Sequence, residues 1–386
     1  MTSRVAYVCA DPGIPVFGTK GASVHVQEII RAWRARGAEV HVYAVRLGDE
    51  VPADLADLPV HLVRVGGKGL DPAQREVAQQ AAAAELGRQV VELAPDVVYE
   101  RYSLFSSVLE QARVGLGSAV RTVLEVNAPL IDEQRTHRVL VDEAAAVGAL
   151  RTQLAAADVV GCVSEPVADW VRDRAEAGDR IPAVVVVPNG VNTERVRPVT
   201  PDPDGPPVVV FVGTLKPWHG VEDLVRAAAL AEQPWRLRLV GDGPQRETVE
   251  RLAAEHVLDV ELVGAVAPEQ VPAALEGARV AVAPYPATAA SDHYFSPLKV
   301  YEYAAAALPV VASRIGQIPS VVEDDVTGVL VPPSDPPALA AAVDALVADP
   351  ARATRLGATG RARMEERHSW HHVLDATLAA APELVP

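Results

Sequence analysis

Short apolar segments alternate with amphipathic segments along the first half of the chain. Apolar stretches of strand length occur at residues 4–8, 39–45, 60–65, 96–99, 122–126, 158–163 and 183–187. Segments with the helical spacing of apolar residues lie between them, at residues 23–36, 71–93, 103–112, 131–157 and 165–174. Strands that alternate with helices indicate a parallel sheet covered on both faces, so this half is predicted to be an α/β domain.

The pattern breaks at residues 197–207, RPVTPDPDGPP, whose five prolines and one glycine favour a linker or hinge. It then restarts, with strands predicted at residues 208–212, 235–240, 260–263, 279–283 and 328–331 and helices at residues 221–231, 245–255, 268–276, within 335–366 and at 370–378. We predict a first domain over residues 1–195 and a second over residues 208–368. A helix within residues 369–386 is expected to pack back on the first domain. The joint between two such domains is the natural place for a ligand cleft.

Composition and charge narrow the classes of function. The chain has 386 residues, 49% hydrophobic and 22% charged, with a formal net charge of −16. This charge argues against a nucleic-acid partner, which would call for a basic surface. No apolar run reaches the ~20 residues of a membrane span. Residues 1–13 show no signal-peptide pattern, and Cys9 and Cys162 are expected to be buried thiols, so we predict a cytoplasmic protein. Peripheral membrane contact and a homodimer stay open.

The stretch at residues 291–313, SDHYFSPLKVYEYAAAALPVVAS, is typical of a polar loop, a helix and a buried strand. The residues where the chain enters the helix are Ser296, Pro297 and Leu298. The free amides of the first helical turn, together with Lys299, suit a phosphate group. Glu302 lies one turn deeper, where it could accept hydrogen bonds from a ribose. The alternative is a solvated Lys299–Glu302 pair worth ~0.3 kcal/mol.

Three further loops follow predicted strands, where ligands bind in open parallel sheets. In FGTKGA, Gly18, Thr19 and Gly21 would let amides approach an anion, although a simple glycine-containing turn is the better explanation of this loop taken alone. In GTLKPWHG, Lys216 and His219 could face a diphosphate. In GDGP, Gly241 would let a flat base lie on the backbone, or the following aspartate may simply be a helix cap.

Other single residues are weaker candidates. Asn127 ends a strand two residues after Glu125, and either side chain could face a ligand or cap the next turn. His25 and Arg101 could line a site or serve the structure. The sequence has no metal-ligand spacing, and no dinucleotide fingerprint follows the first strand. It also lacks a Walker loop and a G-x-S-x-G elbow.

Taken together and in order, several segments make the chain resemble the retaining GT-B glycosyltransferases of family 4. They are GTKGASVHVQEI, YERYS, EVNAP, CVSEPV and VPNGVN, then FVGTLKPWHGVEDL, LVGDGP, VAPYP, SPLKVYEYAAAALPVVAS, TGVLVPP and HSW. The resemblance implies two Rossmann-like domains whose parallel sheets face each other across a cleft. It implies a nucleoside-diphosphate sugar of the UDP or GDP type on the second domain and a small-molecule or glycan acceptor on the first. It further implies retention of anomeric configuration, with no metal or other cofactor.

The resemblance also carries over individual residues. Glu302 matches the second glutamate of the family's E-x7-E motif, which binds the ribose, and residues 296–299 match the phosphate-facing loop. Residues 18–21 match the glycine loop over the diphosphate. Asn127 falls where many members place a histidine near the sugar.

The chain departs from the family pattern at the sugar and phosphate positions. The first motif glutamate falls at Tyr294, so Asp292 or His293 is expected to contact the sugar hydroxyls. The family's phosphate-binding arginine and lysine fall at Thr214 and His219. Lys216 is therefore the candidate that restores the charge, and His219 is expected to assist.

The mechanism that the resemblance implies is front-face substitution at the anomeric carbon, in which the charge on the leaving diphosphate must be stabilised. The candidate catalytic residues are Asn127, Lys216, His219 and Lys299. The rival hypotheses are a nucleotide-binding oxidoreductase, a non-catalytic sugar-nucleotide-binding protein, and a GT-B phosphorylase or epimerase.

Overall fold

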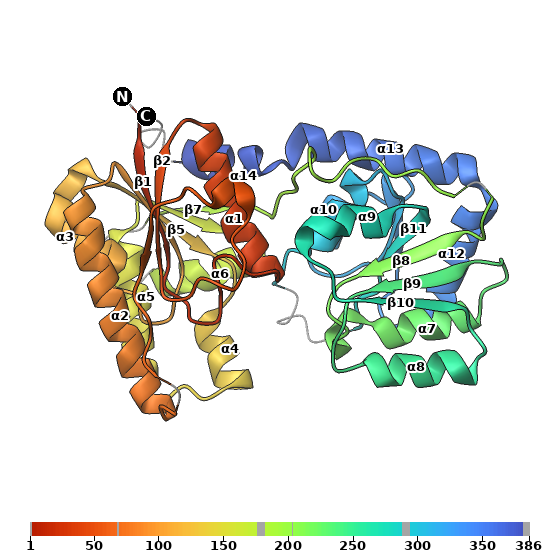
Figure 1. Cartoon of the computed structure of the whole chain (residues 1–386), viewed down its shortest axis with the longest axis horizontal. Coiled ribbons are helices and arrows are strands. Elements are labelled where there is room, and N and C mark those ends of the chain that lie inside the picture. Colours follow the sequence, from red (N-terminus) through yellow and green to blue (C-terminus); the bar gives the residue numbers. More distant parts are fainter. Residues whose placement is uncertain (1, 68, 176–181, 203, 288–293, 381–386) are drawn as a thin grey trace. The chain divides into compact units, whose positions relative to one another are not determined.

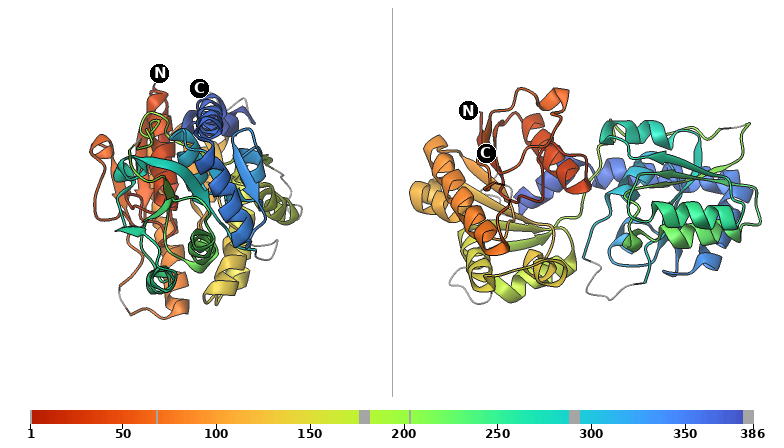
Figure 2. Two further views of the ribbon diagram at one scale, coloured as in Figure 1. Left: turned by 90° about the vertical axis from the view of Figure 1, so that its right-hand side faces the viewer. Right: turned by 60° about the horizontal axis from the view of Figure 1, so that its bottom comes forward.

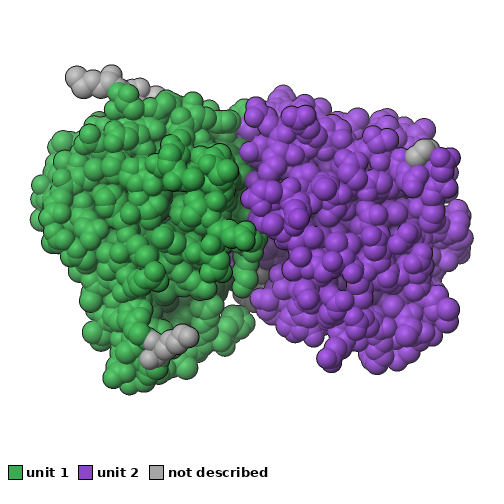
Figure 3. Space-filling view, viewed as in Figure 1, with its two compact units in different colours: residues 1–188, 370–386 green, residues 189–369 purple. Residues whose placement is uncertain are grey.

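The chain forms two compact units, shown in Figure 3. We describe a computed structural model, in which residues 2–67, 69–175, 182–202, 204–287 and 294–380 are placed. Unit 1 comprises Met1–Pro188 and Trp370–Pro386, and unit 2 comprises Asn189–Ser369. The chain therefore passes from one unit to the other twice, after Pro188 and after Ser369.

Unit 1 is a parallel α/β unit, as predicted (Figure 1). Its strands are β1 (Arg4–Cys9), β2 (Glu39–Ala44), β3 (Val60–Leu62), β4 (Val97–Arg101), β5 (Arg121–Val126), β6 (Val159–Cys162) and β7 (Ala183–Val186). Within the described residues the order across the sheet is β3-β2-β1-β4-β5-β6-β7. The direction of the order changes between β1 and β4. β1 is almost wholly buried, because helices cover a parallel sheet on both faces.

The helices of unit 1 lie on both faces of this sheet (Figure 1). They are α1 (Gly21–Ala35), α2 (Pro72–Leu93), α3 (Val108–Leu116), α4 (Leu130–His137), α5 (Glu143–Ala156), α6 (Glu165–Ala175) and α14 (Trp370–Ala379), with short 3-10 turns at Ala53–Leu55 and Gly117–Ala119. The C-terminal helix α14 packs against α1 and β6. The rings of His25 and Trp370 meet edge to face, with centroids 4.8 Å apart.

Unit 2 is a second parallel α/β unit, and the views in Figure 2 show helices on both faces of its sheet. Its strands are β8 (Val208–Val212), β9 (Arg236–Val240), β10 (Val260–Gly264), β11 (Ala278–Ala283), β12 (Val310–Ser313) and β13 (Gly328–Val331). The order of these described strands is β10-β9-β8-β11-β12-β13, which changes direction between β8 and β11.

Two buried apolar clusters hold the helices of unit 2 to its sheet. The helices are α7 (Val221–Ala229), α8 (Arg246–Glu255), α9 (Val271–Leu275), α10 (Leu298–Ala305), α11 (Ile318–Val321), α12 (Pro336–Ala348) and α13 (Pro350–Arg367), with 3-10 turns at Pro217–His219 and Pro268–Gln270. Helices α7, α8 and α12 contribute to one cluster, and α9 and α10 contribute to the other.

Two predicted helices differ from the structure. The helical region expected at residues 131–157 is two helices, α4 and α5, because Asp142 ends the intervening segment as the side-chain cap of α5. The helix expected at residues 103–112 begins only at Val108. The segment at residues 197–207 belongs to unit 2 and is tied to it where the Val199 N–H donates to the Ala306 carbonyl.

Candidate functional site

The point where the strand order of unit 2 changes direction is the expected place for a ligand. Gly213 directly follows β8, Gly241 follows β9, and Tyr285 lies just beyond β11. Both glycines have positive φ, 148° and 141°. A Cβ at Gly241 would lie 2.0 Å from the Gly213 carbonyl oxygen, and a Cβ at Gly213 would lie 2.8 Å from Lys299 Nζ. Glycine is thus required for the backbones and the lysine to come together here.

Lys299, in the first turn of α10, brings a cation to this point. Its Nζ lies 4.0 Å from the ring centroid of Phe211 in β8 and 5.3 Å from that of Tyr285. Although the residue as a whole is partly exposed, the Nζ atom is buried and has no hydrogen-bond partner among the described residues. Burial lowers the pKa of this ammonium to about 7, against the opposing effect of Glu302. The alternative of a solvated Lys299–Glu302 pair is therefore wrong.

The N-terminus of α10 lies beside this lysine and presents free donors. Pro297 is its N-cap and offers no side-chain hydrogen bond. The first turn also lacks an acidic residue, whereas α12 is capped by Asp335. The N–H groups of Leu298 and Lys299 have no acceptor within the helix, whereas the Val300 N–H donates to the Pro297 carbonyl at 3.0 Å. Their dipole and the lysine together favour an anion.

Ser296 precedes this helix and is already engaged within the protein. Its carbonyl accepts a hydrogen bond from Asn189 Nδ2 at 2.7 Å, and its hydroxyl lies 3.1 Å from the Tyr301 hydroxyl. Ser296 is only 8% exposed. These contacts, through its carbonyl and its hydroxyl, therefore hold Ser296 in place directly before α10.

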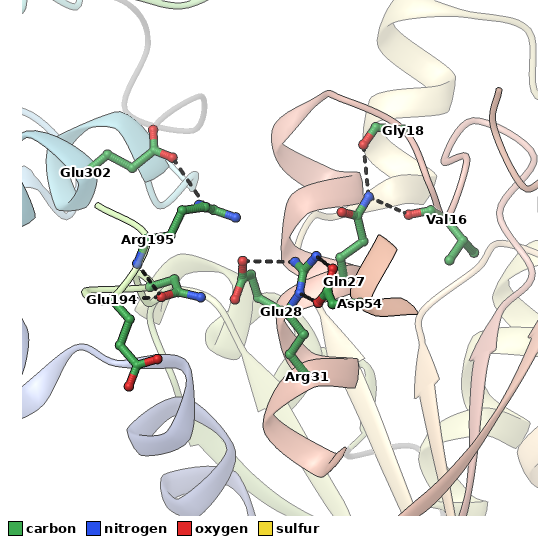
Figure 4. Close-up of polar contacts among 10 residues, drawn as sticks. Val16, Gly18, Gln27, Glu28, Arg31, Asp54, Glu194, Arg195 and Glu302 are labelled. Atoms are coloured by element: carbon green, nitrogen blue, oxygen red, sulfur yellow. Dashed lines mark hydrogen bonds and ion pairs between the residues drawn. The ribbon is translucent and has the colours of Figure 1, made fainter. Parts of the chain in front are cut away.

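Glu302 lies one helical turn beyond Lys299 and is partly exposed. Figure 4 shows its carboxylate next to Arg195, with 3.9 Å between Arg195 Nη2 and Glu302 Oε1. At this distance the contact with Arg195 is an ion pair without a hydrogen bond. A carboxylate only accepts and offers about four acceptor sites, which is the chemistry that suits ribose hydroxyls. Asp292 and His293, the expected sugar contacts, lie outside the described residues.

His219 and Lys216 flank the same strand end. The Thr214 carbonyl lies 2.5 Å from His219 Nδ1, and since a carbonyl only accepts, this nitrogen carries the proton. Burial, followed by repulsion from Lys299 and Lys216, lowers the pKa of His219 to about 3. Any assistance that His219 gives to Lys216 at a diphosphate would therefore start from a neutral ring. Lys216 Nζ lies 4.6 Å from the ring centroid of the exposed Trp218.

The neutral state of His219 predicts a specific response to acid. Its pKa in the folded protein is below the ordinary value of 6.5, so the unfolded chain takes up the proton first as pH falls. We expect this residue to lower the free energy of unfolding by about 1–2 kcal/mol between pH 7 and pH 5. Urea unfolding of His219→Gln should show a correspondingly smaller loss of unfolding free energy over the same pH range. An identical pH dependence in the variant and the wild type would contradict the assignment.

The corresponding point of unit 1, where the strand order changes between β1 and β4, holds a buried polar network around Glu125. The contacts to its carboxylate are His25 Nε2 at 2.8 Å, Tyr99 Oη at 2.7 Å, Arg101 Nη1 at 2.9 Å and Asn127 Nδ2 at 2.5 Å. Burial alone would raise the pKa of Glu125, but His25, Arg101 and Tyr99 lower it to about 2. The carboxylate is thus a charged anchor for its neighbours.

This network orients Asn127. Because a carboxylate only accepts, the Asn127 atom that faces Glu125 is Nδ2, which leaves Oδ1 as an acceptor. Sequence reasoning treated Glu125, His25 and Arg101 as weak candidates and missed Tyr99. Their common signal is position, because Arg101 and Glu125 pair at the carboxyl ends of adjacent strands, and Tyr99 precedes Arg101 by two residues in β4. A cavity of about 10 Å³, enough for about one water molecule, separates this network from Val373 and Thr377 of α14.

The glycine loop before α1 differs from the expectation in one respect. The Gly18 N–H donates to the Pro15 carbonyl at 3.1 Å, so it is not free for an anion in this conformation. The side-chain amide of Gln27 in turn donates to the carbonyls of Gly18 and Val16 (Figure 4). Thr19 precedes α1 and Gly21 begins it, and this helix has neither a side-chain cap nor an acidic residue in its first turn.

The described ranges contain no cluster of three or more His, Cys, Asp or Glu side chains that could hold a metal ion. None of the helices placed there combines the length and the apolar character that crossing a bilayer requires.

Comparison with known proteins places this fold and these loops in a family. Residues 19–195 match the model for glycosyltransferase family 4, and residues 206–349 match the model for glycosyl transferases group 1. The D-inositol 3-phosphate glycosyltransferase of Kineococcus radiotolerans is 31% identical over 415 aligned positions, covering 96% of this chain and 91% of that protein. The α-maltose-1-phosphate synthase of Mycolicibacterium smegmatis is 34% identical, covering 59% of this chain and 64% of that protein.

Solved structures show the same fold. The Anabaena protein HepE, solved in complex with UDP and glucose, superposes with a TM-score of 0.70 at 17% identity, with 99% of each chain covered. Such a low identity carries the fold alone. Because the family models match both units and the K. radiotolerans relative aligns over nearly the whole length, the chain belongs to glycosyltransferase family 4.

Proposed function

We propose that the protein transfers a sugar from a nucleoside-diphosphate sugar to a hydroxyl group, or another nucleophile, of a small molecule or glycan. The observation that carries the proposal is the buried ammonium of Lys299, which has no hydrogen-bond partner in the described part of the chain. A buried charge is costly unless it is paired. A diphosphate at the N-terminus of α10 would supply the missing anion, and family membership makes a sugar nucleotide its natural source.

The groups near the end of β8 would bind different parts of the nucleotide. Lys299 Nζ and the first amides of α10 would hold the phosphate oxygens, and Lys216 would add a second positive charge from its partly exposed position. Glu302 would accept hydrogen bonds from the ribose. The His219 ring is neutral before the nucleotide binds, and an adjacent diphosphate would raise the pKa of this histidine. Asn127 Oδ1 in unit 1 would accept a hydrogen bond from a substrate hydroxyl.

We further propose front-face substitution with retention of configuration and without a required metal. The bond between the anomeric carbon and the diphosphate oxygen breaks, and the acceptor oxygen bonds to the same face of that carbon. The acceptor proton passes to the departing phosphate oxygen. Lys299 and the amides of α10 would present a fixed charge and fixed dipoles to the negative charge that develops on the diphosphate. Preorganised electrostatic stabilisation of this kind is usually the largest single contribution to catalysis.

A thermal-shift screen with UDP, GDP, ADP and dTDP tests the proposal. We expect one diphosphate, with UDP the first candidate by analogy with HepE, to stabilise the protein. A nucleotide at 100 times its dissociation constant adds about 2.7 kcal/mol to the free energy of unfolding. EDTA should leave the shift unchanged, and the donor should release its diphosphate only when an acceptor is present. If none of the four nucleotides shifts the Tm, the proposal is wrong.

A further inference from the structure

Asn189 is the first residue of unit 2, and it makes two hydrogen bonds to the loop before α10. Its backbone N–H donates to Ser296 Oγ at 3.2 Å, and its side-chain Nδ2 donates to the Ser296 carbonyl at 2.7 Å. The two residues are 107 positions apart in sequence. Asn189 is 7% exposed and Ser296 8% exposed. Both bonds are therefore shielded from water and hold the same residue from two sides.

The residue held in this way sets the start of α10. Ser296 is followed by Pro297, the N-cap, whose ring fixes φ and removes one freedom from the turn. The Ser296 hydroxyl also contacts that of the buried Tyr301, one turn along the same helix. Because Asn189 and Tyr301 fix Ser296, the direction of the first N–H groups of α10 is fixed as well. The backbone position of Lys299 is fixed with them.

The segment by which the chain enters unit 2 also pairs with the segment by which the chain leaves it. The Val191 N–H donates to the His368 carbonyl at 2.7 Å, and Val191 pairs with Ser369 in an isolated bridge. The Tyr301 ring packs edge to face against the His368 ring, with centroids 5.4 Å apart. The loop before α10 is thus bonded directly to the first connecting segment and, through Tyr301, packed against the second.

We propose that Asn189 is a positioning residue for the donor nucleotide: its side-chain amide holds the Ser296 carbonyl so that the first amides of α10 and Lys299 face the diphosphate. The inference rests on the proposed function, because it assigns a supporting residue to the same site. Asn189 does not touch the nucleotide in this account and acts through Ser296. Only asparagine combines the required length with an N–H donor at this place, since aspartate would set a carboxylate against the Ser296 carbonyl.

The test compares Asn189→Ala and Asn189→Asp with Asp349→Ala. Asp349 caps α13 in the same unit, where its side chain accepts a hydrogen bond from the Arg352 N–H, so its loss lowers stability without touching the donor loop. The probe is whichever of UDP, GDP, ADP and dTDP stabilises the wild type. We expect both Asn189 variants to bind it about 10-fold more weakly or worse, because small misplacements at such sites have large effects. Asp349→Ala should bind it within about twofold of the wild type.

Hydrogen exchange of the peptide that contains the start of α10 gives a second readout that needs no ligand. Exchange at Leu298 and Lys299 should be faster in Asn189→Ala than in Asp349→Ala at a matched loss of Tm. Equal nucleotide affinity in Asn189→Ala and Asp349→Ala would overturn this inference while leaving the proposed function intact. Unchanged exchange at the start of α10 would overturn it as well. A wild type that binds none of the four nucleotides would overturn both.

Discussion

Replacing Lys299 with methionine is expected to lower kcat/KM about 10²- to 10³-fold, the usual effect of removing one preorganised group that stabilises developing negative charge. The same change should make the ligand-free protein more stable, not less. Methionine fills the space beside Phe211 and Tyr285 without a charge, whereas the wild-type Nζ is buried and has no hydrogen-bond partner among the residues placed in the structure. Opposite effects on activity and stability separate a ligand-binding lysine from a structural one.

The pKa of Lys299 adds a pH signature to this variant. Its folded-state pKa of about 7 lies below the ordinary 10.5, so between these values the unfolded chain holds the proton more tightly. The contribution of Lys299 to the free energy of unfolding therefore rises as pH increases from 7 to about 10. Chemical unfolding across that range should show the rise in the wild type and a flatter profile in Lys299→Met. Parallel losses of activity and stability would contradict the account.

The second large effect concerns Glu302. We expect Glu302→Ala to weaken binding of the nucleoside diphosphate by about 1–3 kcal/mol, or about 5- to 150-fold, because hydrogen bonds from ribose hydroxyls to a charged carboxylate are lost. The carboxylate is suited to this role since it is partly exposed and only accepts hydrogen bonds. Isothermal titration with the nucleotide that stabilises the wild type measures the change.

A modified nucleotide provides the control for Glu302. The 2′,3′-dideoxy form of the same diphosphate lacks both hydroxyls, so the wild type and Glu302→Ala should bind it with nearly equal affinity. The loss from the variant and the loss from the missing hydroxyls should therefore not add. If Glu302→Ala weakens the dideoxy form as strongly as the natural one, Glu302 acts on α10 or on Arg195 and not on the ribose.

The fold was largely predictable because each strand and helix carries its own pattern of apolar residues. The break between α4 and α5 was missed because, besides the Asp142 cap, the contact that holds the segment between the two helices comes from elsewhere in the chain. The buried carboxylate of Glu76 in α2 accepts hydrogen bonds from the N–H groups of Val141 and Asp142, at 2.7 and 2.8 Å. A partner 65 residues away leaves no trace in the local pattern.

The candidate site was predictable in its residues but not in their states. Spacing placed Lys299 in the first turn of a helix, yet its burial depends on rings contributed by β8 and by the loop after β11. The neutral state of His219 could not be predicted for a similar reason. Its pKa is set by burial and by Lys299, which is 80 positions away in sequence and adjacent only in the fold. Charge states depend on neighbours that the sequence alone does not reveal.

The central claim, that unit 2 binds the donor diphosphate at the start of α10, is tested most directly by a crystal structure with the nucleoside diphosphate that stabilises the protein. The account predicts phosphate oxygens within hydrogen-bond distance of Lys299 Nζ and of the first N–H groups of α10, with the ribose hydroxyls on Glu302. A diphosphate bound elsewhere, with Lys299 Nζ still buried and without an anionic partner, would contradict it.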